Sequence, residues 1–174
     1  MTRLHAGPAA DGRVCPPPED GDTWVSLSPV PLPVDEITRW VKERRSGAVV
    51  TFLGCVRDHS PGREGVVTLE YSAYDGPALR RMGEVAEAAR RRWPAIGRLA
   101  IVHRTGCLEV SDDAVAVSAS SPHRDEAFAA AKYCIDTVKA TVPLWKRERW
   151  TGGGVGPGGE DWGTCAHDLE PVEP

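Results

Sequence analysis

Apolar side chains recur every three or four residues in three stretches of the chain, 34–45, 77–93 and 122–142. This spacing predicts helices that each turn one side toward a core. We expect Ser121 to cap the third helix, Pro122 to begin it and Pro143 to end it. The residues expected on the core-facing sides are Val34, Ile37, Trp40 and Val41; Leu79, Met82, Val85, Ala86, Ala89 and Trp93; and Phe128, Ala131, Ile135, Val138 and Val142.

Runs rich in β-branched and apolar residues predict the strands: "GAVVTFLGCV" from Gly47, "VVTLEYSAY", "RLAIVHR" and "AVAVSAS". The first two flank a loop with Pro61-Gly62 and are expected to pair with each other. The last two are joined across "TGCLEVSDD". "PLWKRERW" is expected to be a short extended segment or an edge strand. The order is helix, two strands, helix, two strands, helix, strand, which predicts an α+β domain around a largely antiparallel sheet.

Composition divides the chain into three parts. Residues 1–22 are rich in Pro, Gly, Ala and Asp and poor in large apolar side chains, so we expect a disordered leader. Residues 23–150 are expected to form the folded α+β domain. Residues 151–174 read as a glycine-rich acidic tail, of which only Trp162 indicates partial docking.

Charge and cysteine content exclude several classes of protein. The net charge is -4, with a mildly basic middle and two acidic ends, which argues against a nucleic-acid binder but leaves room for a local anion site. The five cysteines are scattered and form no C-x-x-C pair, which indicates free thiols in a reducing compartment. No stretch resembles a signal peptide or a membrane span, so the expected location is the cytoplasm.

The stretch "KATVPLWKRERW" holds two of the only four lysines, on either side of Pro143. Helical spacing puts Lys139 beside the core-facing side, where partial desolvation would suit a lysine to act as a general base or amine nucleophile. The alternative is a lysine that buries its stem and extends its ammonium into water. Lys132 and Lys146 are open to the same two interpretations.

Two further groups of residues suggest an anion site. His123 and Arg124 lie in the first turn of the third predicted helix, where free N–H groups already favour an anion, so a phosphate or carboxylate ligand would compensate them. Pairing with Asp125 or Glu126 is the alternative. Arg57 ends a predicted strand and opens a loop, which suits either a functional or a surface arginine. His59 and His103 have no ligand spacing and are interpreted as structural.

Five ordered segments strongly resemble the large catalytic subunit of molybdopterin synthase: "VTFLGCVRDHSPGR", "LEYSAYDGPALRRM", "IVHRTGCLEV", "SASSPHRDEAF" and "VKATVPLWKRERW". The resemblance spans roughly residues 24–162. It implies an α/β hammerhead fold with an added antiparallel β subdomain, and a homodimer that binds a small ubiquitin-like sulfur-carrier subunit at each end, giving a heterotetramer. It also implies a sulfurtransferase that converts cyclic pyranopterin monophosphate to molybdopterin with two sulfurs from the carrier's C-terminal Gly-Gly thiocarboxylate.

The resemblance assigns roles residue by residue. The essential lysine of the motif K-x-x-x-P-x-W-K corresponds to Lys139 and the second active-site lysine to Lys146. The family's anion-binding arginine at its V-R motif corresponds to Arg57. The family's H-R pair corresponds to His123 and Arg124. No metal or cofactor is expected at this step, and the sulfur comes from the carrier rather than from a cysteine of this chain.

The chain departs from the family pattern at both ends, since its leader is longer and no Lys or Arg follows Arg149. Family members commonly have a basic C-terminal segment, and a phosphate contact from there or from the dimer mate is expected. Two other hypotheses remain at this point. One is a non-catalytic paralogue that only binds the carrier, and the other is an unrelated ferredoxin-like α+β domain that binds a phosphorylated ligand.

Overall fold

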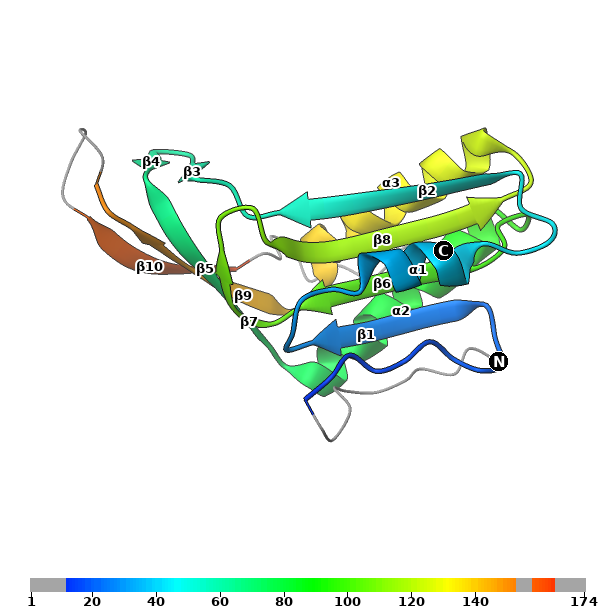
Figure 1. The fold of residues 1–174 in the computed structure, drawn as a ribbon, viewed down its shortest axis with the longest axis horizontal. Helices are drawn as coiled ribbons and strands as arrows, with labels where there is room; N and C mark the ends of the chain where they lie inside the picture. Colours follow the sequence, from blue (N-terminus) through cyan, green and yellow to red (C-terminus); the bar gives the residue numbers. More distant parts are fainter. Residues whose placement is uncertain (1–11, 153–157, 165–174) are drawn as a thin grey trace.

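The computed structural model describes residues 12–152 and 158–164 of the chain, and it contains two four-stranded sheets that lie end to end (Figure 1). Three helices pack on the first sheet, and a two-stranded hairpin of β3 and β4 projects beside the second. The strands are β1 (Thr23–Ser28), β2 (Ala48–Cys55), β3 (His59–Ser60), β4 (Arg63–Glu64), β5 (Val66–Ala73), β6 (Leu99–Arg104), β7 (Gly106–Glu109), β8 (Asp113–Ser121), β9 (Leu144–Trp150) and β10 (Gly159–Thr164); the helices are α1 (Val34–Val41), α2 (Asp75–Arg92) and α3 (Arg124–Thr141).

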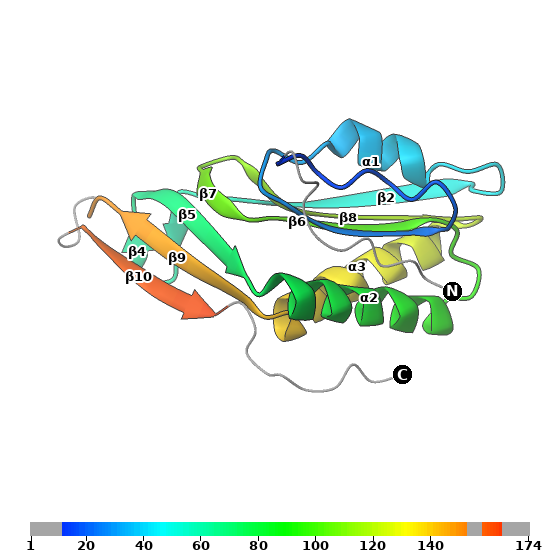
Figure 2. The same ribbon diagram turned by 90° about the horizontal axis from the view of Figure 1, so that it is seen from below.

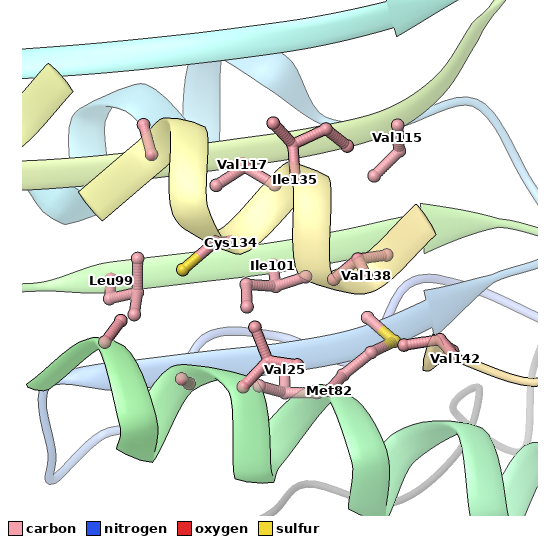
Figure 3. Close-up of a cluster of buried hydrophobic side chains, with 14 of the residues drawn as sticks. Val25, Met82, Leu99, Ile101, Val115, Val117, Cys134, Ile135, Val138 and Val142 are labelled. Carbon is pink, nitrogen blue, oxygen red and sulfur yellow. The ribbon is translucent and has the colours of Figure 1, made fainter. Parts of the chain in front are cut away.

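The first sheet has the strand order β1-β6-β8-β2, with β1 parallel to β6 and the other pairs antiparallel. Helices α2 and α3 cover one face and α1 covers the other (Figure 2). Strand side chains such as Ile101 and Val117 meet Met82 of α2 and Ile135 of α3 in the larger core cluster (Figure 3). Because this core fixes both helices on the sheet, the C-terminal end of α3 points toward the second sheet.

The second sheet has the order β10-β9-β5-β7, and all of its pairs are antiparallel. The α+β class is therefore confirmed, although the chain forms two sheets where one was expected. The predicted pairing of the strand 47–56 with the strand 66–74 is wrong. β2 pairs with β8 while β5 pairs with β7 and β9, because the loop between β2 and β5 forms the hairpin of β3 and β4 and leads the chain into another sheet.

The segment after Pro143 is extended, as expected, but it is not an edge strand. β9 lies between β5 and β10 and pairs with both. β10 comes from the acidic tail, and the guanidinium carbon of Arg147 lies 5.0 Å from the centre of the Trp162 ring. The tail thus contributes a strand that the sequence pattern did not predict.

Strands β1 and β7 were also not predicted from the sequence. All six residues of β1 are buried, including Ser26 and Ser28, whose hydroxyl groups donate to the carbonyls of Leu27 and Val30. A short strand with buried serines has no apolar alternation, which explains why the pattern did not reveal it. β7 is only four residues long and lies in the segment interpreted as a connection between two strands.

Helices α1 and α2 bury the predicted stripes, and of the stripe predicted for α3, Ala131, Ile135, Val138 and Val142 are buried as well, but the buried side extends further around the helix than expected and leaves out Phe128. Phe128 is 61% exposed, whereas Ala127, Ala130 and Cys134 are fully buried. The buried side is centred about 50° around the helix axis from the predicted side. Small side chains carry this contact, so a pattern weighted toward large apolar residues misplaced it. The start was also misplaced: His123 is the N-cap and the helix begins at Arg124, while Ser121 belongs to β8.

Of the predicted leader, residues 1–11 lie outside the described residues, as do 153–157 and 165–174 of the tail. Within the leader's described part, Val14 packs against the second core cluster, which includes Ile37 and Val41 of α1. The carbonyl of Cys15 accepts a hydrogen bond from Trp24 Nε1 at 3.1 Å. Across the described ranges, no helix is long and apolar enough to cross a membrane.

Candidate functional site

A pocket of about 770 Å³ lies where the first sheet meets the second. The end of β2 and the loop after it form one wall, the last turns of α3 form another, and β5 and β9 close it. The predicted site residues Lys139, Lys146 and Arg57 all line this pocket. The loop after β2 and the consecutive elements α3 and β9 therefore bring three cationic side chains to one cavity.

The break at Pro143 places the two lysines. α3 ends at Thr141, Val142 forms its C-cap, and β9 begins at Leu144. Lys139 thus reaches the pocket from a helix and Lys146 reaches it from a strand. Lys132 is not among the lining residues and forms an ion pair with Asp136 one helical turn away. The structure therefore separates Lys132 from the other two lysines, which spacing alone could not do.

Lys139 is exposed, so the burial expected for it is not found. Its Nζ lies 5.8 Å from the centre of the Phe52 ring, whose π-face attracts a cation. The rotated buried side of α3 explains the exposure, because the rotation leaves Lys139 on the flank of the helix.

Glu148 holds Lys146 in place. One carboxylate oxygen accepts a hydrogen bond from Lys146 Nζ at 3.0 Å, and the other accepts from Ser60 Oγ at 2.8 Å and Arg63 Nη1 at 2.9 Å. Burial of Glu148 raises its pKa, but the hydrogen bonds from Ser60 and Lys146 outweigh this effect and the pKa is lowered overall. The buried carboxylate therefore ties the β3–β4 hairpin to β9 and fixes the second lysine.

Arg57 follows the end of β2 and is exposed at the pocket wall. Among the residues that the structure describes, none forms an ion pair with it. An arginine without a carboxylate partner beside two lysines makes this wall of the pocket a suitable place for an anion.

His103 also lines the pocket, although sequence reasoning interpreted it as structural. It is 4% exposed, and its ring meets the ring of Tyr71 edge to face at 4.8 Å. Burial lowers the pKa of His103 to about 4; the hydrogen bond to the Arg104 carbonyl opposes this shift and the charge of Lys139 adds to it. A single histidine in an apolar strand gave no signal, since only the second sheet turns this position into a pocket wall.

His123 and Arg124 lie at the other end of α3. Fifteen residues separate Arg124 from Lys139, about 22 Å along a helix. Both His123 and Arg124 are exposed, and the closest contact of Arg124 with Asp125 is 3.9 Å between two almost fully exposed side chains, which contributes little energy. The pair is thus free for a ligand but is not in the same pocket as the lysines of its own chain.

Cys55 and Cys134 do not have the surroundings of a reactive thiolate. Cys55 lines the pocket, but its hydrogen bond to Asp113 and its partial burial raise the pKa of the thiol. Burial raises the pKa of Cys134 to about 12. In the described part of the chain, no group of three or more His, Cys, Asp or Glu side chains is arranged to hold a metal ion.

Residues 27–141 match the MoaE protein family, which is well over half of the chain. The chain belongs to the MoaE family. A related sequence, the molybdopterin synthase catalytic subunit of Nostoc sp., is 45% identical over 123 residues, which cover 71% of this chain and 74% of that protein. The family therefore confirms the sequence-based resemblance and makes the chain a sulfur-transferring enzyme of molybdenum cofactor biosynthesis.

Solved structures agree with this MoaE assignment. The molybdopterin synthase of Staphylococcus aureus superposes with a TM-score of 0.69 at 32% identity, covering 83% of this chain and 98% of that one. A complex of subunits 1 and 2 of the molybdopterin-converting factor from Helicobacter pylori superposes with a TM-score of 0.58 at 16% identity, covering 74% of this chain and 84% of that one, which supports the fold alone.

Proposed function

We propose that this MoaE family member converts cyclic pyranopterin monophosphate to molybdopterin, with two sulfurs taken from the thiocarboxylated C-terminus of a small ubiquitin-like carrier. The observation that carries the proposal is the convergence of Lys139, Lys146 and Arg57 on one pocket. A phosphorylated substrate and a thiocarboxylate are both anionic, and a cluster of three cations in a partly enclosed site is suited to bringing them together.

Each cation has a distinct role in the proposal. Arg57 binds the phosphate through charge-assisted hydrogen bonds. Lys139 and Lys146 transfer protons and stabilise the negative charge that develops in two steps: the thiocarboxylate sulfur bonds to a substrate carbon, and water then attacks the carrier's carbonyl carbon. The second step breaks the bond from that carbon to sulfur, so the sulfur stays on the substrate and the carrier leaves as a carboxylate. The sulfur nucleophile arrives with the carrier, so none of the five cysteines takes part.

A second copy of the chain supplies His123 and Arg124 to the pocket in this proposal. β2 is an edge strand of the first sheet, apolar and half-buried, and no described residue pairs with its outer edge. The start of β2 lies beside the start of α3, since Gly47 N donates to the Ser121 carbonyl at 3.0 Å, and the end of β2 lines the pocket. If two β2 strands pair antiparallel about a two-fold axis, the α3 start of each copy faces the pocket of the other.

The remaining expectations are part of the same proposal. The two-sheet arrangement is interpreted as an α/β hammerhead with an added antiparallel β subdomain, formed here by β5, β7, β9 and β10. Two copies of the chain and two carriers form a heterotetramer in this proposal. Free thiols and the nature of the reaction fit a cytoplasmic enzyme.

The test combines purified protein with the precursor and a thiocarboxylated carrier and measures molybdopterin. We expect product with the intact carrier and none with a folded carrier that lacks its last two residues, because an extended Gly-Gly tail must reach Lys139. Product from the truncated carrier would contradict the sulfur-carrier mechanism. A stable complex with the intact carrier but no product would identify a non-catalytic binding module instead.

A further inference from the structure

His103 is the one buried polar residue on the inner wall of the pocket whose role the proposed reaction leaves open. It lies near the end of β6 on the same face as Leu99 and Ile101, both of which belong to the core beneath α2 and α3. The strand continues the core as far as this position, where an imidazole replaces an aliphatic side chain. Since the residue is 4% exposed and lines the pocket, its small accessible part faces the cavity.

The hydrogen bonding of the ring defines its tautomer. Nδ1 lies 2.8 Å from the carbonyl oxygen of Arg104, which can only accept, so Nδ1 carries the hydrogen. In the neutral ring Nε2 then holds a lone pair. Among the described residues, none donates a hydrogen bond to Nε2. The ring is held on its other side by the edge-to-face contact with Tyr71, so this acceptor has a fixed position.

We infer that His103 is a further substrate-binding residue, whose Nε2 accepts a hydrogen bond from an N–H group of the pterin ring system. This inference rests on the proposed function. A lone pair repels phosphate oxygens, so His103 cannot bind the phosphate end of the substrate. The walls around it, Leu69, Tyr71 and Val115, are apolar or aromatic and fit a flat heterocycle.

His103 and Arg57 together orient the substrate. The guanidinium of Arg57 at the exposed wall attracts the phosphate, while the neutral imidazole on the buried wall accepts from the ring. The reverse orientation would bring phosphate oxygens against a lone pair and leave the ring's donors beside a cation. In this orientation the carbons that receive sulfur lie in the pocket that Lys139 and Lys146 also line.

Two substitutions separate this role from a structural one. The amide of His103→Asn overlays Nδ1, so it keeps the hydrogen bond to Arg104 but loses the acceptor in the pocket. The amide of His103→Gln overlays Nε2 and keeps the acceptor. We expect Asn to weaken binding of the precursor by up to about tenfold and Gln to remain within about threefold of wild type, as measured by calorimetry without the carrier. Inorganic phosphate, which probes the Arg57 end of the pocket, should weaken precursor binding by the same factor in wild type and in both variants.

The opposite order, with Asn like wild type and Gln impaired, would assign His103 a structural role only. Wild-type binding by both variants would also overturn the inference. If both variants fail to fold, nitrogen NMR on histidine-labelled wild-type protein decides, with the His103 signal assigned by elimination using variants of the other four histidines. We expect the Nε2 resonance to move to lower frequency when the precursor saturates the site.

An unmoved Nε2 resonance in a protein that still makes molybdopterin would reject the inference and leave the proposed function intact. Wild-type protein that neither binds the precursor nor makes product would instead reject the proposed function itself.

Discussion

Lys139 and Lys146 share one pocket but differ in their surroundings. Lys146 is held by Glu148, whereas Lys139 is exposed and lies over the ring of Phe52. We expect Lys139→Ala and Lys139→Arg both to slow single-turnover product formation at least about a hundredfold with the carrier saturating, because an arginine keeps the charge but cannot release a proton.

Lys132→Ala is the matched control, since Lys132 lies on the same helix but outside the pocket. It should keep the wild-type rate. A robust rate for Lys139→Arg would mean that this residue acts only as a cation, and a folded but inactive Lys132→Ala would mean that the wrong lysine has been assigned.

Glu148 makes the stability of the fold depend on pH in the acid range. Its pKa is lower in the folded state, so its contribution is complete above the unfolded pKa of about 4.3 and is lost as the pH falls through the folded value. Urea unfolding should show wild type more stable than Glu148→Gln by about 1–3 kcal/mol at pH 7, with the difference shrinking below about pH 4. A difference that stays constant down to pH 3 would contradict this assignment.

At the scale of residues, the sequence could offer Lys139, Lys146 and Arg57 as candidates because a proline break and a strand end are local features, and the family motif chose among the lysines. The structure brings the three to one pocket, and their roles stay predictions. The sequence missed His103 and the partners of Glu148, which depend on contacts between residues distant in sequence. Ser60 and Arg63 contact Glu148 only because β9, which pairs with β5 and β10, lies beside the hairpin of β3 and β4.

At the scale of elements, the junction of β2 and α3 depends on a glycine. A Cβ on Gly47 would lie 2.4 Å from the carbonyl oxygen of Pro122, a backbone atom that cannot rotate away. Gly47→Ala should cost about 1–3 kcal/mol in urea unfolding. Gly76→Ala in the first turn of α2 meets nothing nearer than Arg80 Nη1 at 3.5 Å, so it should be neutral or stabilising by up to about 1 kcal/mol. Equal effects would show that the junction is not tightly packed.

The helices could be predicted because their spacing is local, whereas the strand partners could not. β2 and β5 are neighbours in sequence and both are apolar, yet they belong to different sheets. The sheet to which each strand belongs is decided by the pairing of β2 with β8 and of β5 with β9. These partners are distant in sequence, so their pairing depends on packing across the whole chain. The exposed Phe128 shows the same limit within a helix, since alanines and a cysteine made the closer contact.

For the whole molecule, the separation of Arg124 from Lys139 leads to a test with mixed dimers. Lys139→Ala and Arg124→Ala should each lose most of the activity when they are assayed alone. If each pocket combines Lys139 of one copy with Arg124 of the other, a mixed dimer has one intact site. Random re-pairing of equal amounts, after mild dissociation, should then restore about a quarter of the wild-type activity.

No recovery in mixed dimers whose formation has been verified by mass spectrometry would contradict a pocket shared between the two copies. Full activity of Arg124→Ala alone would instead remove this residue from the site.

Because β9 pairs with a strand on each edge, its sequence tolerates few changes in length. Lys146 lies opposite Tyr71 of β5 and faces the pocket with Glu148, while Arg147 lies opposite Glu70 on the other face. Since successive residues of a strand point to opposite faces, deleting one codon between Pro143 and Lys146 would exchange the two sets of side chains. The protein could keep its strand and still present Arg147 where the amine belongs. The number of residues between Pro143 and Lys146 is therefore constrained, because it decides which side chains of β9 face the pocket.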